Sequence, residues 1–164
     1  MRVGVDEAGK GPVLGPMVAA AVRAPTAALP EGVDDSKRLS SERRETLAAA
    51  LREHPDVSVG VAVVGTDRID DPDTDMNALT VAAQAEALAP VVDAADAVLA
   101  DAGDVSESRF ARRLREALPV EAAVSAAHGA DADDPHVAAA SVVAKVERDA
   151  RVAALREEYG EVGS

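Results

Sequence analysis

Asp6 and Glu7 are the two residues of this chain with the clearest potential for chemistry. They stand at the end of the short apolar segment 2–6 and directly before Gly9-Lys10-Gly11. Ionised carboxylates at the end of a buried strand are costly unless a cation or hydrogen bonds compensate them. Divalent cations such as Mg²⁺ prefer carboxylate oxygen, so the pair predicts a metal site. The alternative is an acidic strand end that is simply exposed to water.

Asp101 repeats this arrangement, because it follows the short apolar segment 97–100. Strand ends that are neighbours in one sheet can bring such acids close together. Two divalent ions about 4 Å apart can activate a water and stabilise the leaving oxygen of a phosphodiester. Asp131, shortly before the last helical segment, could supply a fourth carboxylate. The alternatives are a chance match for Asp101 among 30 acids and solvated loop positions for Asp131, Asp133 and Asp134.

Other kinds of site find less support. The spacing of residues 4–10 fits a phosphate-binding P-loop as far as its lysine, but Gly11 stands where that loop needs Ser or Thr for magnesium. No two histidines have the four-residue spacing of a helical zinc site, so we interpret them as structural or surface groups: His54, His128 and His136. No Ser and His arrangement of the nucleophile type is evident.

Lysine is almost absent, and its few positions are therefore informative. The three lysines are Lys10, Lys37 and Lys145, and Lys145 shares a helix face with Arg148. Lys10 lies between two glycines beside the paired acids, and Lys37 follows Asp35-Ser36. Each is either a phosphate contact or an ordinary surface charge.

The elements that must position these residues alternate along the chain. We expect strands at residues 2–6, 13–22, 57–64, 97–100 and 120–124, a polar loop at 66–75, and helices from Ser40 to His54, at 76–92, from Ser106 to Pro119 and at 135–159. The expected helix caps are Ser40, Asp75, Ser106 and Asp134. Strands first and then strands alternating with helices predict an α/β fold, a mixed sheet covered by helices. The length of 164 residues suits one domain.

The overall charge is strongly negative, with 30 Asp and Glu against 17 Lys and Arg and a formal net charge of −13. This suits a cytoplasm with molar salt, where the Debye length falls to roughly 3 Å and acidic surfaces stay hydrated. Taken alone, the charge argues against a nucleic-acid partner. There is no cysteine and no apolar segment long enough for a bilayer, so we expect a cytoplasmic location without membrane association.

Several motifs together resemble type 2 ribonuclease H, or ribonuclease HII, in its archaeal form. The segments that carry the resemblance are residues 5–17 (VDEAGKGPVLGPM), 35–39 (DSKRL), 100–101 with 104–105, 128–131, and 138–149 (AAASVVAKVERD). The first and the last are long and specific. The resemblance spans nearly the whole chain.

The resemblance implies an RNase H-like fold with four carboxylates that bind two Mg²⁺ or Mn²⁺ ions. These are Asp6, Glu7, Asp101 and Asp131. The implied substrate-binding residues are Gly9, Lys10, Gly11, Ser36, Lys37, Ser141, Lys145 and Arg148. The turn at residues 9–11 resembles the family element that contacts the 2′-hydroxyl, the group that distinguishes RNA from DNA. The implied substrates are RNA/DNA hybrids and DNA with embedded ribonucleotides. The implied cleavage lies 5′ of a ribonucleotide and leaves 3′-hydroxyl and 5′-phosphate ends.

Two departures from the family pattern qualify these expectations. Gly129 stands where relatives usually carry lysine, and the chain stops at Gly163-Ser164, where a Gly-Ser-Gly-Tyr motif would begin. We therefore expect a monomer without the family's last helices, and the absent end would be the segment that recruits a sliding clamp. The alternatives are a catalytically impaired nucleic-acid-binding fragment and a nuclease of similar fold that acts on DNA.

Overall fold

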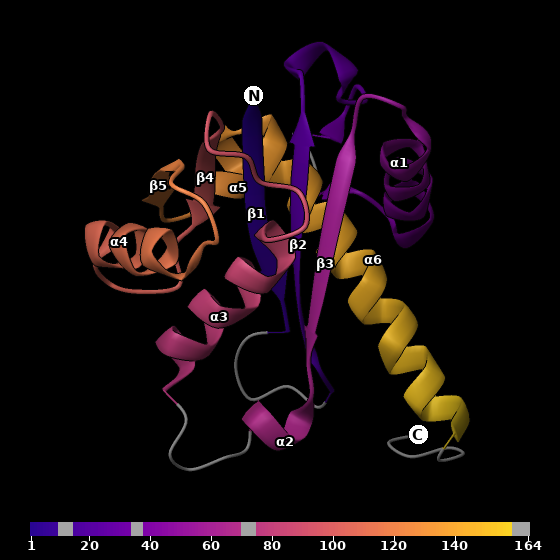
Figure 1. Ribbon diagram of the computed structural model, residues 1–164. Helices are drawn as coiled ribbons and strands as arrows, with labels where there is room; N and C mark the ends of the chain where they lie inside the picture. Colours follow the sequence, from indigo (N-terminus) through magenta and orange to yellow (C-terminus); the bar gives the residue numbers. More distant parts are fainter. Residues whose placement is uncertain (10–14, 34–37, 70–74, 159–164) are drawn as a thin grey trace.

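A five-stranded mixed sheet forms the centre of the protein. The computed structural model describes residues 1–9, 15–33, 38–69 and 75–158. The strands are β1 (Arg2–Ala8), β2 (Met17–Ala24), β3 (Ser58–Val64), β4 (Ala97–Asp101) and β5 (Ala123–Ala127), in the spatial order β3-β2-β1-β4-β5. β1 pairs antiparallel with β2 and parallel with β4 (Figure 1). The predicted mixed sheet is confirmed.

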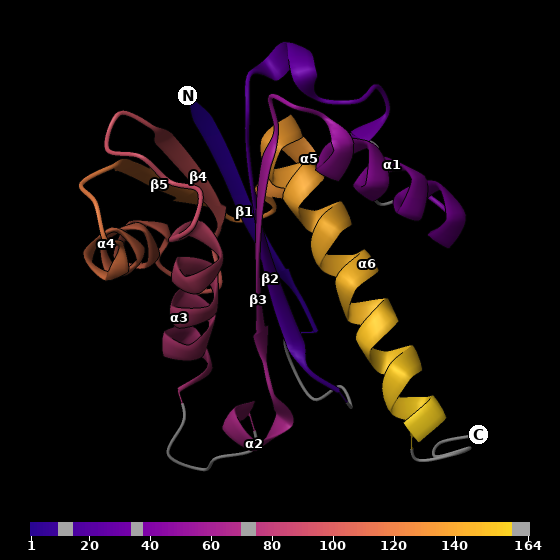
Figure 2. The same ribbon diagram turned by 45° about the vertical axis from the view of Figure 1, so that its right-hand side comes forward.

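Helices cover both faces of this sheet. α1 (Ser41–Glu53) and α6 (Pro135–Glu158) lie on one side, and α3 (Met76–Leu88) and α4 (Glu107–Ala117) lie on the other, as Figure 2 shows. Three short elements complete the described part: a 3₁₀ turn at Thr26–Ala28, α2 (Thr66–Ile69) and α5 (Ala130–Asp133). None of the described helices is long and apolar enough to cross a membrane.

Each face of the sheet has its own hydrophobic core. On the α3/α4 face, Val3 and Val5 of β1 pack with Phe110 and Leu114 of α4. On the other face, the core combines residues of β2, α1 and α6, among them Ala20, Val22, Leu47, Leu51 and Val143. The four-residue spacing of Phe110 and Leu114 in the sequence thus follows the buried side of α4.

The predicted helix caps are confirmed at the atomic level. The side chains of Ser40, Asp75 and Ser106 accept hydrogen bonds from the main-chain nitrogens of Arg43, Asn77 and Arg109, at 3.1, 2.9 and 3.2 Å. Oδ1 of Asp134 accepts from the nitrogens of His136 and Val137, so it caps α6. These bonds satisfy main-chain donors that have no partner within the helix.

Several predicted boundaries are wrong. The strand expected at 13–22 is β2 at Met17–Ala24. The strand expected at 120–124 is β5 at Ala123–Ala127, where each residue pairs with one residue of β4. α3 ends at Leu88 rather than at residue 92, since Pro90 has no N–H to continue the helix. The segment 66–75 is expected to be a loop, but its first residues form the short helix α2.

Gly4 brings the first strand into direct contact with the last helix. A Cβ atom on Gly4 would lie 2.2 Å from the carbonyl carbon of His136, at the start of α6. Nε2 of His136 also lies 2.8 Å from the carbonyl oxygen of Ala24 in β2. The absence of a side chain at Gly4 therefore lets the N-terminus of α6 lie against β1.

Candidate metal centre

Three carboxylates from separate parts of the chain meet at one end of the sheet. Asp6 follows Val5 in β1, and Asp101 follows Ala100 in β4, at the end of a parallel pairing in which Val5 is opposite Ala100. Asp131 comes from α5, directly after β5. One carboxylate oxygen of each lies within 4.8 Å of those of the other two, a spacing suited to a shared metal ion. We call these three residues the acid group.

Burial and like charge act together on Asp6. Its side chain is only 6% exposed. Burial raises the pKa of the Asp6 carboxyl well above its usual range, and the neighbouring charges of Glu7 and Asp101 raise it further. The main-chain nitrogen of Glu7, which donates to Oδ1 of Asp6 at 2.8 Å, acts in the opposite direction. A bound cation would reverse this balance, because opposite charge favours the ionised carboxylate.

Glu7 reaches the same end of the sheet from the opposite face. Successive residues of a strand point to opposite sides, so Asp6 faces α5 and α6 whereas Glu7 faces α3. Oε2 of Glu7 accepts a hydrogen bond from Nε2 of Gln84 at 2.6 Å. Glu7 is therefore outside the acid group, although its charge acts on Asp6.

Gln84 is a residue of this region that the sequence reading missed. It lies fully buried in α3, and its Nε2 also donates to the main-chain oxygen of Asp101 at 3.1 Å. One amide nitrogen thus links the strand that carries Glu7 to the strand that ends in Asp101. The sequence contains one indication of its burial: Gln84 is a polar residue four positions before Leu88, on the buried side of the helix.

The other predicted contact residues are distributed along α6 and the start of the glycine-rich segment. Ser141 is 1% exposed, and Lys145 and Arg148 are partly buried. Gly9 has a φ of 87°, and a Cβ there would lie 2.2 Å from Nε of Arg148. That nitrogen donates to the carbonyl oxygen of Pro16 at 3.1 Å. The remaining predicted residues lie outside the described residues: Lys10, Gly11, Ser36 and Lys37.

All three histidines make structural contacts, as the sequence indicated. Nδ1 of His54 accepts from the main-chain nitrogen of Asp56 at 3.0 Å, and Nε2 of His136 bonds to Ala24. Nε2 of His128 lies 2.5 Å from the carbonyl oxygen of Asp104. No histidine belongs to a potential metal site among the residues that the structure describes.

The comparisons with known proteins agree with this geometry. The sequence profile of the family described as Ribonuclease HII matches residues 3–164. The chain belongs to the ribonuclease HII family. It is therefore a ribonuclease H, an endoribonuclease among the hydrolases.

Individual relatives place the chain more narrowly. Ribonuclease HII of Haloarcula marismortui is 57% identical over 164 residues, which cover all of this chain and 77% of that protein. The structure of the PCNA:RNase HII complex from Archaeoglobus fulgidus matches with a TM-score of 0.88 and 37% identity, covering 100% of this chain and 79% of that one. Bst-RNase HIII in complex with Mn²⁺ matches with a TM-score of 0.71 and 27% identity, covering 97% and 55%. The RNase H-like fold and the likeness to halophilic relatives are thus confirmed.

Proposed function

We propose that this ribonuclease H binds two divalent metal ions, Mg²⁺ or Mn²⁺, through Asp6, Glu7, Asp101 and Asp131. The observation that carries the proposal is the acid group, in which three oxygens from separate elements lie within 4.8 Å of one another. Ionising the buried Asp6 among like charges is costly, and a bound cation would offset that cost, which a solvated strand end would not have. The Mn²⁺ complex of Bst-RNase HIII, a protein of similar fold, supports the same metal class.

The chemistry proposed for this centre is hydrolysis of a phosphodiester 5′ of a ribonucleotide. Bound metal ions would activate the attacking water and stabilise the leaving oxygen. Asp6, Asp101 and Asp131 would hold these ions, and the hydrogen bond from Gln84 orients Glu7, the fourth proposed ligand, on the opposite face of β1. The products carry 3′-hydroxyl and 5′-phosphate ends.

The proposed substrates are the RNA strand of RNA/DNA hybrids and ribonucleotides embedded in duplex DNA. Discrimination for RNA rests on the backbone of residues 9–11 at the 2′-hydroxyl, as the family resemblance implies. Arg148 lies against Gly9 and bonds to Pro16, so it supports the described ends of this segment. Ser141 and Lys145 lie one turn apart on α6, the helix that also carries Arg148. We propose that both contact the substrate next to Arg148.

A sliding clamp is the proposed protein partner, because the relative from Archaeoglobus fulgidus was solved as a PCNA complex. The chain spans about three quarters of the length of its curated relatives, 77% of the Haloarcula protein. We also propose that the protein acts as a monomeric catalytic domain in the cytoplasm.

The test is a cleavage assay in molar KCl with three matched duplexes that contain no, one or several ribonucleotides. The expected result is Mg²⁺- or Mn²⁺-dependent cutting of the last two, on the 5′ side of a ribonucleotide, and no cutting of the all-DNA duplex. Asp6→Asn should abolish this cutting and leave the fold intact. Cutting of all-DNA duplex would instead favour a DNA nuclease, and binding without any cutting would favour an impaired fragment.

A further inference from the structure

The arginines of this acidic protein are concentrated on one helix. α4 carries four of the chain's 14 arginines against two glutamates, Glu107 and Glu116. In α1 and in α6, by contrast, the basic and acidic residues are equal in number. α4 is thus the one helix in the described ranges with a net positive charge, in a chain of net charge −13. A local charge opposite to that of the whole molecule calls for an explanation.

Three of these arginines share one face of α4, which we call the arginine face: Arg109, Arg112 and Arg113. Their spacing of three and four residues places them side by side, away from the buried Phe110 and Leu114. Nε of Arg109 donates to Oδ2 of Asp104 at 2.7 Å, and its Nη2 donates to Oδ1 at 2.5 Å. The arginine face is therefore anchored to the loop 102–106, which begins directly after Asp101.

Charged groups on two other elements interact with the arginine face. Arg109 and Arg113 both hold the pKa of Asp104 below its usual range. The charge of Asp75, the cap of α3, acts on Arg109. Through Asp104, the arginine face is joined to the loop that begins directly after Asp101, a member of the acid group.

Two members of the arginine face are available to an external anion. Arg112 is exposed and Arg113 is partly exposed. Neither forms an ion pair with a carboxylate in the described part of the chain, although elsewhere Arg52 pairs with Glu147 and Arg23 pairs with Asp96. An exposed guanidinium group that forms no ion pair can bind phosphate oxygens through its charge and its fork of N–H donors.

We propose that Arg112 and Arg113 contact the phosphate backbone of the duplex that is cut at the acid group, with Arg109 holding α4 in place. The inference rests on the proposed function and extends it to the duplex beyond the cleaved bond. In molar salt each phosphate contact is weakened, because counterions released on binding gain less entropy in a concentrated salt solution. Two neighbouring arginines compensate for part of this loss.

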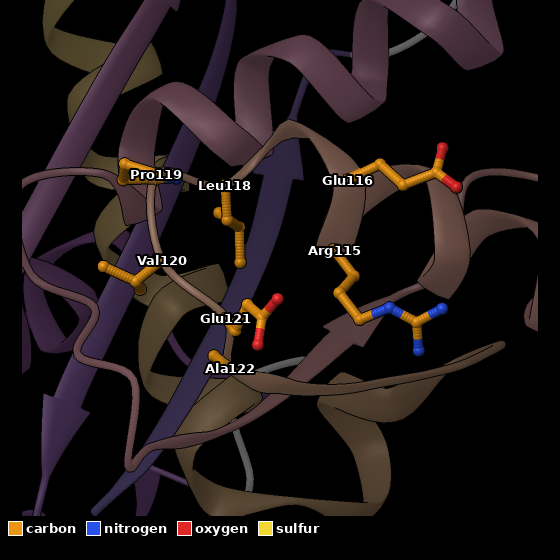
Figure 3. Close-up of a pocket in the computed structure, with 7 residues that line it drawn as sticks. All are labelled: Arg115, Glu116, Leu118, Pro119, Val120, Glu121 and Ala122. Carbon is orange, nitrogen blue, oxygen red and sulfur yellow. The ribbon is translucent and has the colours of Figure 1, made fainter.

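Arg115 offers a matched control on the same helix. It lies in the last turn of α4, one turn after Arg112 and farther along the helix from the loop 102–106, beside a hollow of about 590 Å³ that Leu118, Pro119 and Val120 also line, as Figure 3 shows. This hollow lies before the start of β5, whereas Asp131 follows the end of β5. Removing Arg115 therefore changes the net charge by the same amount as removing Arg112, at the end of α4 that is farther from Asp101.

The experiment measures kcat and KM for cleavage of an RNA/DNA hybrid at several KCl concentrations. For Arg112→Ala with Arg113→Ala we expect a several-fold higher KM, little change in kcat, and a slope of log KM against log salt that is lower by about 1.8, or 0.9 for each lost contact. With Arg113→Lys in place of Arg113→Ala, the KM should be closer to that of the wild type, since lysine keeps the positive charge. Arg115→Ala should behave as the wild type.

The outcomes separate this inference from the proposed function. Thermal unfolding of each variant verifies that the fold is intact, and Arg112→Ala alone serves if the double variant is unstable. A wild type that cuts the hybrid, together with unchanged KM and slope in the arginine variants, overturns the inference and leaves the proposed function standing. An equal effect of Arg115→Ala also overturns it, because bulk charge would then be the cause. A wild type that does not cut the hybrid overturns both.

Discussion

Nε2 of Gln84 lies 2.6 Å from Oε2 of Glu7, and the same nitrogen bonds to the main-chain oxygen of Asp101. A single buried side chain of α3 thus orients one proposed metal ligand relative to the strand that carries another. Partners of this kind hold ligands in place, and their loss commonly costs about 10- to 100-fold in metal affinity or activity. Gln84 is therefore a positioning residue of the proposed site.

Replacing Gln84 should weaken the site without dismantling the fold. We expect Gln84→Met to lower kcat and Mn²⁺ affinity by about 10-fold or more, because Glu7 loses its donor. Thr80→Val is the control: Thr80 is equally buried, one turn earlier in α3, and its hydroxyl bonds only within the helix, to Met76 at 2.8 Å. Equal activity losses in both variants would assign Gln84 a merely structural role.

His128 should act as a positioning residue through the loop that follows Asp101. Its Nε2 lies 2.5 Å from the carbonyl oxygen of Asp104, and its main-chain nitrogen donates to Glu107 at 2.7 Å. The turn before Asp131 is thereby tied to the loop after Asp101. We expect His128→Ala to lower Mn²⁺ affinity several-fold, as calorimetry would show. His54→Ala, which alters a histidine at the end of α1, should leave that affinity unchanged, and a reversed order would contradict the assignment.

Gly4 should tolerate no side chain. The Cβ of Gly4→Ala would meet the backbone of His136, which cannot rotate away, so α6 must shift from β1. We expect a loss of about 3 kcal/mol in the free energy of unfolding, measured with urea in molar KCl. Gly129→Ala is the contrast, because nothing lies within 4 Å of its Cβ position and only the φ of 64° is strained. Its expected cost is about 1 kcal/mol, and a greater loss there than at Gly4 would refute the contact argument.

The ion pair of Asp104 with Arg109 should make stability depend on pH in the acid range. Hydrogen bonds from Arg109 hold the pKa of Asp104 below its usual range in the folded protein. A carboxyl whose pKa is lowered by folding stabilises the protein above its unfolded pKa of about 4, and this contribution disappears as the pH falls. The stability difference between wild type and Arg109→Met should thus be constant from neutral pH to about 5 and shrink below about 4. A difference that grows on acidification would be inconsistent with the ion pair, and Arg112→Met is the control.

Much of this architecture could be predicted from local sequence. The caps at Ser40, Asp75, Ser106 and Asp134 were predictable because a cap depends on residues only two or three positions apart. Asp6 and Asp101 stood out since each ends an apolar strand. The direct approach of α6 to Gly4 joins residues far apart in the chain, so the partner of Gly4 could not be named from the sequence.

The rest depended on contacts between distant residues. β5 lies at Ala123–Ala127 because β4 pairs with it there, and no propensity of these alanines indicates a strand. Gln84 has an ordinary helical position, and only the packing of α3 on the sheet brings it to Glu7. The separation of Glu7 from the acid group follows from strand alternation, which could have been applied to two adjacent acids at the outset.

Metal binding tests the central claim most directly. Mn²⁺ is titrated calorimetrically into wild type, Asp6→Asn, Asp101→Asn and Asp133→Asn in molar KCl, with thermal unfolding to verify each fold. Asp133 is the matched control, an exposed acid of α5 two residues from Asp131 and outside the acid group. We predict saturable binding that Asp6→Asn and Asp101→Asn each weaken severely and Asp133→Asn leaves unchanged. Equal Mn²⁺ affinity in all four proteins would contradict the account.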